Sequence, residues 1–127
     1  MSVIAYPSKH FRYAETLSVR TRGLALTDEL RRVIRGCVAA AMGRFQERVR
    51  RVFVWVEDSN GPKGGPAMHC RMEVTLKRGG RFTATAAATD EYVAIGRAAD
   101  RLRVRLVRSL EKRRHRRRET PSPLLKA

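Results

Sequence analysis

A two-residue period in the side chains is the feature that most limits how this chain can fold. Residues 49–57 read V-R-R-V-F-V-W-V-E, with Val52, Val54 and Val56 on one side and Phe53 and Trp55 on the other. Residues 70–77 and 82–86 keep the same two-residue period, which is typical of half-buried β-strands. The turn sequence K-R-G-G at 77–80 separates the last two of these strands, so an antiparallel meander is predicted.

A further strand and two helices are predicted around this meander. Residues 15–22 also alternate, and the sequence T-D-E at 27–29 has the pattern of a helix N-cap with acids in the first turn. That helix is expected to run to about residue 47, and Thr89-Asp90 is expected to cap a second, longer helix. Their apolar positions are Leu30, Val33, Ile34, Cys37, Val38, Ala41 and Phe45, then Tyr92, Ile95, Ala99, Leu102, Leu106 and Leu110.

The element order is therefore β-α-β-β-β-α. Four half-apolar strands and two amphipathic helices predict an α+β fold, a two-layer sandwich in which both helices cover one face of a four-stranded sheet. We expect residues 1–14 to form an N-terminal arm, residues 15–118 a single domain, and residues 119–127 a flexible tail.

The charge of the chain points to a polyanionic partner. The sequence holds 28 Lys+Arg against 12 Asp+Glu, a formal net charge of +16. Such a charge favours nucleic acid, or less often an anionic membrane surface. A surface that is merely well solvated usually carries charges of both signs.

Basic residues recur on one side of the second helix. At about 100° per residue, Arg97, Arg101, Arg105, Arg108 and Lys112 fall within about 80° of one another, opposite the apolar stripe. Like charges one turn apart repel, and a partner's phosphates would relieve that cost. A solvated helix face explains part of this pattern, but not five bases without an acid among them. Arg103, near the apolar stripe, is expected to extend its guanidinium to solvent.

The first helix adds Arg32 and Arg35 opposite its apolar face and Arg31 on the flank. Two such helices side by side would present one broad basic surface, which suits recognition of RNA shape and backbone better than reading bases in a DNA groove. Phe53 and Trp55 could stack on bases, or they could belong to the core with the valines facing outward. The sequence leaves both arrangements open.

Catalytic and metal-binding patterns are absent from the sequence. His10, His69 and His115 are scattered, and no nucleophile or carboxylate pair has the spacing of an active site. Cys37 and Cys70 lack metal-ligand spacing and are expected to be buried thiols in a reducing cytoplasm. No apolar run reaches the ~18 residues of a membrane span. We therefore expect a cytoplasmic, monomeric protein without enzyme activity, cofactor, metal, small-molecule substrate or membrane partner.

The stretch D-S-N-G-P-K-G-G-P at 58–66 could suggest a phosphate-binding loop. Such a loop would need G-x-x-x-x-G-K-[ST] between a strand and a helix, whereas this one joins two strands. It is interpreted as a connector.

Three passages resemble the ribosome hibernation promoting factor family, which includes the ribosome-associated inhibitor also called sigma-54 modulation protein. They are R-G-L-A-L-T-D-E-L-R-R-V-I at 22–34, V-F-V-W-V-E-D at 52–58 and D-E-Y-V-A-I-G-R-A-A-D-R-L-R-V-R-L at 90–106. Gly96, where Asp or Asn is usual, the 58–66 loop and the 1–14 extension depart from the common short form. The chain thus resembles a divergent short-form member, without the domain through which long members pair ribosomes.

The resemblance implies a fold similar to a double-stranded RNA-binding domain. It also implies binding to small-subunit rRNA in the mRNA and tRNA channel near the decoding centre, which blocks translation in bacteria during stress or stationary phase. The rRNA-binding residues that the resemblance implies are Arg31, Arg35, Arg97, Arg101, Arg105 and Arg108. Arg32 and Lys112 are added from the pattern of basic residues, with further contacts expected from Lys63, Arg113 and Arg114. Two alternatives remain: a general structured-RNA-binding or RNA-chaperone module that shares the fold, and an RNA-directed enzyme.

Overall fold

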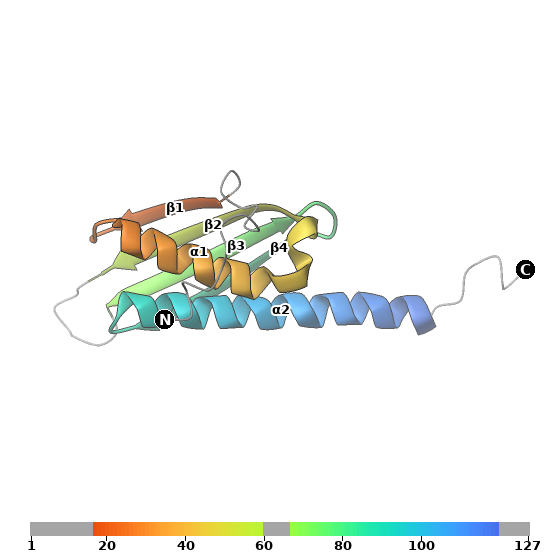
Figure 1. Cartoon of the computed structure of the whole chain (residues 1–127). Helices are drawn as coiled ribbons and strands as arrows, with labels where there is room; N and C mark the ends of the chain where they lie inside the picture. Colours follow the sequence, from red (N-terminus) through yellow and green to blue (C-terminus); the bar gives the residue numbers. More distant parts are fainter. Residues whose placement is uncertain (1–16, 60–66, 120–127) are drawn as a thin grey trace, which may run out of the picture.

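The predicted order of elements is confirmed by the structure, a computed structural model that describes residues 17–59 and 67–119, with side chains as far as Lys112 (Figure 1). The elements are β1 (Leu17–Arg22), α1 (Asp28–Met42), the 3₁₀-helix η3 (Gly43–Arg48), β2 (Val49–Asp58), β3 (Met68–Leu76), β4 (Arg81–Ala88) and α2 (Glu91–Glu119). The expected arm and tail fall almost wholly outside the described residues.

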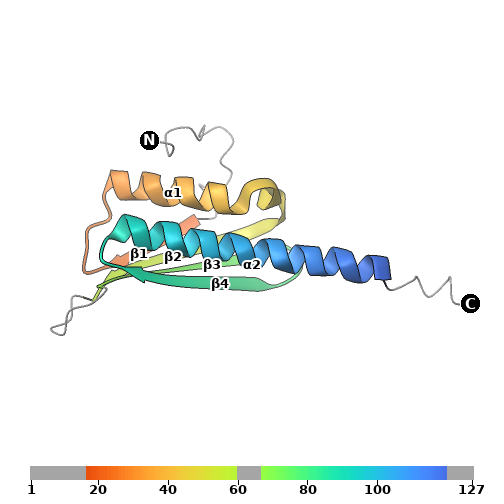
Figure 2. The ribbon, with the colours of Figure 1, turned by 90° about the horizontal axis from the view of Figure 1, so that it is seen from below.

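The four strands form one sheet in the order β1-β2-β3-β4. The last three strands pair antiparallel, as the meander prediction requires, and β1 pairs with β2 in parallel because α1 carries the chain back between them. Both helices lie side by side on one face of the sheet (Figure 2). The predicted two-layer α+β sandwich is therefore confirmed, while its likeness to a double-stranded RNA-binding domain stays a prediction.

The core lies between the helices and the sheet, and it settles which side of β2 faces inward. Val52, Val54 and Val56 are completely buried, together with Ile34 of α1 and Leu102 of α2. The alternation then places Phe53 and Trp55 on the opposite face of the sheet, which the helices leave open. Of the two arrangements that the sequence left open, the structure has the valines in the core.

Both helices begin where their N-cap residues predict. The Oγ1 of Thr27 accepts a hydrogen bond of 3.1 Å from the N–H of Leu30. The Oδ1 of Asp90 accepts two, from the N–H groups of Tyr92 at 2.7 Å and Val93 at 3.2 Å. These caps satisfy amide groups that have no partner inside the helix.

The end of α1 differs from the prediction. The helix stops at Met42 rather than near residue 47, because Gly43 adopts a positive φ of 49° that no regular α-helix contains. The chain continues as the 3₁₀-helix η3, in which Phe45 is half-buried. The spacing of apolar residues therefore continues beyond the end of α1. For this reason the spacing alone predicts an end of the helix that lies too far along the chain.

Replacement of two glycines by alanine is expected to have opposite effects on stability. Gly23 has φ 79°, and a Cβ there would lie 2.7 Å from the carbonyl oxygen of Asp58, whereas a Cβ at Gly96 within α2 would meet nothing within 4 Å. Gly23→Ala should therefore lower the free energy of unfolding by about 2 kcal/mol or more. Gly96→Ala should raise it by about 0.5–1 kcal/mol. Urea denaturation of both variants checks this, and shifts of the same sign would contradict it.

Candidate nucleic-acid interface

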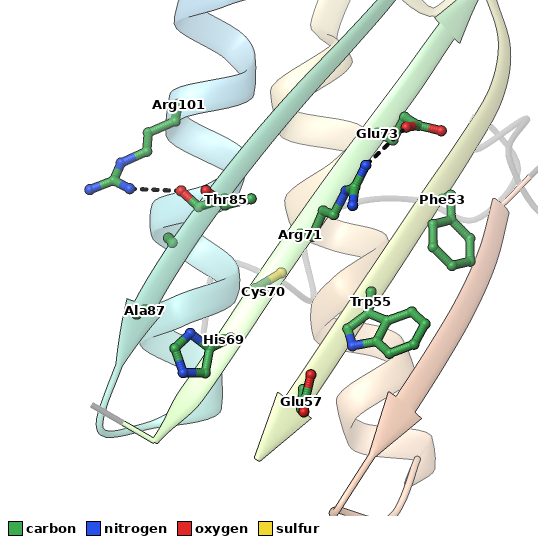
Figure 3. Close-up of a pocket in the computed structure, with 11 residues that line it drawn as sticks. Phe53, Trp55, Glu57, His69, Cys70, Arg71, Glu73, Thr85, Ala87 and Arg101 are labelled. Carbon is green, nitrogen blue, oxygen red and sulfur yellow. Dashed lines mark hydrogen bonds and ion pairs between the residues drawn. The ribbon is translucent and has the colours of Figure 1, made fainter. Parts of the chain in front are cut away.

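Three arginines of α2 lie along the outer edge of the sheet. The Nη1 atoms of Arg97, Arg101 and Arg105 donate hydrogen bonds to the carbonyl oxygens of Ala87, Thr85 and Thr83, at 3.2, 2.7 and 2.6 Å respectively. Figure 3 shows the bond from Arg101 to the backbone of β4. We call these three residues the arginine ladder.

The spacing of helix and strand explains the ladder. The pairing order shows that α2 runs antiparallel to β4, since rising numbers on the helix meet falling numbers on the strand. Four helical residues advance about 6.0 Å, and two strand residues advance about 6.6–6.8 Å. An arginine on every turn of α2 therefore meets every second carbonyl of β4, which is an edge strand of the described sheet.

This position corrects the expectation that the α2 stripe lies opposite the apolar residues. Ala94 and Ala98 are also buried, so the buried side of α2 extends as far as the ladder. The outward ridge of the helix instead carries Val93 and Val104, exposed to 44% and 45%. Arg103 is exposed, as expected of a guanidinium that reaches solvent. The basic residues of α2 thus form its flank toward β4.

The basic residues of α1 lie on a different flank. Burial raises the pKa of the Cys37 thiol, and the carboxylate of Asp100 in α2 is near enough to add to this effect. At 100° per residue, Arg31, Arg32 and Arg35 lie more than about 100° around the α1 axis from Cys37, and all three are exposed. The single broad surface expected from the two helices together stays a prediction.

The two groups of basic residues are named after their helices. The α1 flank consists of Arg31, Arg32 and Arg35, and the α2 flank consists of Arg97, Arg101, Arg105, Arg108 and Lys112.

The α2 flank contains a hollow of about 480 Å³. Arg101, Arg105 and Arg108 line it, together with Asp100, Val104 and residues of β4. A guanidinium has five N–H donors, and the bonds to β4 use one nitrogen each of Arg101 and Arg105. The remaining donors and the convergence of three cations suit phosphate oxygens, which arginine binds in a bidentate manner.

The open face of the sheet carries a second concave surface, which the sequence indicated only through its aromatic pair. Phe53 and Trp55 form a T-shaped contact with ring centroids 6.4 Å apart. A hollow of about 710 Å³ extends from them across β3 to Ala87 and Arg101 (Figure 3). Sequence reasoning missed Arg71, which lines this hollow. Alternation placed Arg71 on the polar side of its strand, and only the pairing of Trp55 with Arg71 shows that the two share a face.

The two thiols are poor nucleophiles. Burial raises the pKa of Cys70 to about 12, and burial also raises the pKa of Cys37. Cys70 is buried as expected, whereas Cys37 is only half-buried. Within residues 17–59 and 67–119, the structure contains no cluster of three His, Cys, Asp or Glu residues that could hold a metal ion. No helix in the same part of the chain is long and apolar enough to cross a membrane.

Some predicted contacts lie beyond what the structure describes. Lys63 belongs to the segment 60–66, and the side chains of Arg113 and Arg114 lie past Lys112. The eight principal candidates are all within the described residues, and all eight are exposed.

Comparison with known proteins identifies the relatives of this chain. In a crystal structure, the N-terminal domain of Protein Y from Thermus thermophilus superimposes with a TM-score of 0.54 at 26% sequence identity, covering 74% of this chain and 94% of that one. A ribosomal subunit interface protein from Coxiella burnetii superimposes with a TM-score of 0.57 at 13% identity, covering 73% and 94%. At that identity the likeness concerns the fold alone.

Curated protein sequences contain no significant match to the chain. The family model described as sigma 54 modulation protein / S30EA ribosomal protein, however, matches residues 17–114. That span takes in all four strands and both helices except the last turns of α2, and the chain belongs to this family.

Proposed function

We propose that this protein is a hibernation factor that binds the small ribosomal subunit and occupies its mRNA and tRNA channel near the decoding centre. The family is one of ribosome-associated hibernation factors, which are not known as enzymes. The proposal includes that the protein acts in the cytoplasm, as a monomer and without enzyme activity.

The hollow on the α2 flank is the observation that carries the proposal. It gathers three arginines on a concave surface of a chain whose net charge is +16. Phosphate groups of rRNA supply the complementary charge, and their contacts position a protein without requiring any particular base sequence. A folded domain held in this way would compete with mRNA and tRNA for the same channel, both sterically and electrostatically.

The division of the basic residues into two flanks sharpens the proposal. The exposed basic residues of the α1 flank and of the α2 flank belong to different helices, and the proposal is that rRNA contacts both groups at once. A channel with walls of rRNA on two sides could do so. Simultaneous contact on two sides would distinguish a channel from an isolated RNA duplex.

Co-sedimentation tests this function. Purified protein is mixed with ribosomes, or with separated subunits, at near-physiological salt, with and without an equal mass of unrelated structured RNA. We expect saturable binding near one protein per small subunit that survives the competitor and is lost when mRNA and tRNA already fill the channel. Binding that the competitor removes would instead favour a general RNA-binding module.

A further inference from the structure

The open face of the sheet is ordered into rows by the strand pairing. Trp55 of β2 pairs with Arg20 of β1 and with Arg71 of β3, and Arg71 in turn pairs with Thr85 of β4. Paired residues point to the same face and lie about 5 Å apart. The half-buried Trp55 is therefore flanked on both sides by exposed arginines.

The same row continues past the edge of the sheet. Arg101, the middle residue of the arginine ladder, binds the carbonyl oxygen of Thr85. Arg101 also lines both hollows, the one on the open face and the one on the α2 flank. The two concave surfaces consequently meet at this residue, around the edge of β4.

The geometry of the open face leaves room for a flat ring. Arg71 extends along its own strand to Glu73, with 3.6 Å between its Nη2 and the carboxylate Oε2, rather than across Trp55 (Figure 3). Phe53 meets Trp55 at an interplanar angle of 61°, which covers less ring surface than a face-to-face stack. Small side chains at Thr85 and Ala87 form the floor of the hollow toward β4.

The charge of the open face favours an anionic occupant. Its arginines are Arg20, Arg22, Arg51, Arg71 and Arg81, against the glutamates Glu57 and Glu73. A second copy of this basic chain would bring like charges together. An acidic peptide would match the arginines, but its acidic side chains offer no aromatic ring to the tryptophan. Single-stranded RNA supplies both phosphates and bases.

We propose that the open face of the sheet is a second RNA-binding surface, which takes a single-stranded segment with one base stacked on Trp55 and the flanking phosphates bound by Arg20, Arg71 and Arg101. Bases of a single strand are free to stack on aromatic side chains, whereas those of a duplex are already stacked on one another. The inference rests on the proposed function only in taking RNA as the partner.

Tryptophan fluorescence provides a direct test, because Trp55 is the single tryptophan of the chain. The full chain is titrated with a twelve-nucleotide oligouridylate and, separately, with a twelve-base-pair RNA duplex. We expect saturable quenching by the single strand and none by the duplex at equal nucleotide concentration. Equal quenching by both, or no quenching at concentrations where a labelled oligouridylate is bound, would overturn the proposal.

Substitutions of Trp55 and Arg71 distinguish base stacking and phosphate binding from effects on structure or on general charge. By fluorescence anisotropy with labelled oligouridylate, Trp55→Ala should lose at least about 5-fold in affinity and Trp55→Phe should regain most of it. Arg71→Gln, at an exposed position, should reduce the salt slope of binding by about 0.7. Arg78→Gln is the matched control for charge, since Arg78 lies in the turn between β3 and β4. If Arg71→Gln and Arg78→Gln changed the salt slope of binding equally, only the net charge would matter, and the inference would be refuted.

Different results would contradict the second RNA-binding surface and the ribosome-binding function. Ribosome co-sedimentation without quenching by a single strand would leave the hibernation function standing and overturn the second surface. Quenching and a Trp55-dependent affinity without ribosome binding would support the surface and overturn the function.

Discussion

Replacement of both Arg108 and Lys112 by glutamine is expected to weaken binding to the small ribosomal subunit about 100-fold at near-physiological salt. Each residue is exposed on the α2 flank, and a hydrogen bond to a charged group contributes about 1.5–3 kcal/mol, which is about 10-fold or more per bond. On a duplex-like target, the salt slope should fall by about 0.9 for each phosphate that the variant no longer neutralises. Co-sedimentation at three salt concentrations measures both effects.

These two positions are chosen because they test binding without removing the hydrogen bonds of the arginine ladder to β4. Lys77→Gln with Arg78→Gln is the matched control, since it removes the same charge from the turn between β3 and β4. An equal loss of affinity in the control would mean that only net charge matters. An unchanged affinity of the Arg108/Lys112 variant would refute the assignment of the α2 flank.

The α1 flank should behave in the same way. Arg31→Gln with Arg32→Gln is expected to weaken binding to a similar degree, because a channel contacts both sides of the helix pair. If only the α2 variant loses affinity, rRNA contacts one flank and the two-sided arrangement is wrong.

Removal of the arginine ladder should destabilise the fold and cause self-association. Glutamine at positions 97, 101 and 105 is too short to reach β4, so three hydrogen bonds from charged donors are removed. Relief of repulsion between the arginines offsets part of this loss, and we expect the free energy of unfolding to fall by about 1–2 kcal/mol. The uncovered edge of β4 then offers carbonyl groups to a second chain.

Urea denaturation and sedimentation velocity at increasing protein concentration measure these two effects. The matched control replaces the same three arginines by lysine, which retains the charge and can still donate to β4. We expect the lysine variant to keep the association state of the parent and most of its stability. A glutamine variant that is as stable as the parent and associates no more than the parent would show that the ladder does not protect the edge.

The ladder gives the α2 arginines two roles that the sequence alone could not separate. By sequence, their i,i+4 repeat is a cost to the helix that an RNA partner would relieve. In the structure, carbonyl oxygens of β4 already accept from Arg97, Arg101 and Arg105. The same bonds hold Arg101 and Arg105 at the hollow that Arg108 shares, so the edge of the sheet positions the proposed phosphate site.

Local features of the sequence determined the elements, their order and the starts of the helices. A two-residue period reports which strand residues share a face, and Thr27 and Asp90 cap helices through contacts within three residues. These interactions join near neighbours, so a sequence displays them directly. The predicted end of α1 was wrong because the apolar period continues through η3 beyond Gly43.

Only the tertiary structure decided which face of β2 is buried and where the basic residues point. Either side of an alternating strand that is apolar on both sides can face the core, and the packing of α1 and α2 against Val52, Val54 and Val56 made the choice. The bonds of the ladder join residues 10 to 22 positions apart. Such contacts depend on which strand lies at the sheet edge, and hydrophobic periodicity carries no information about strand order.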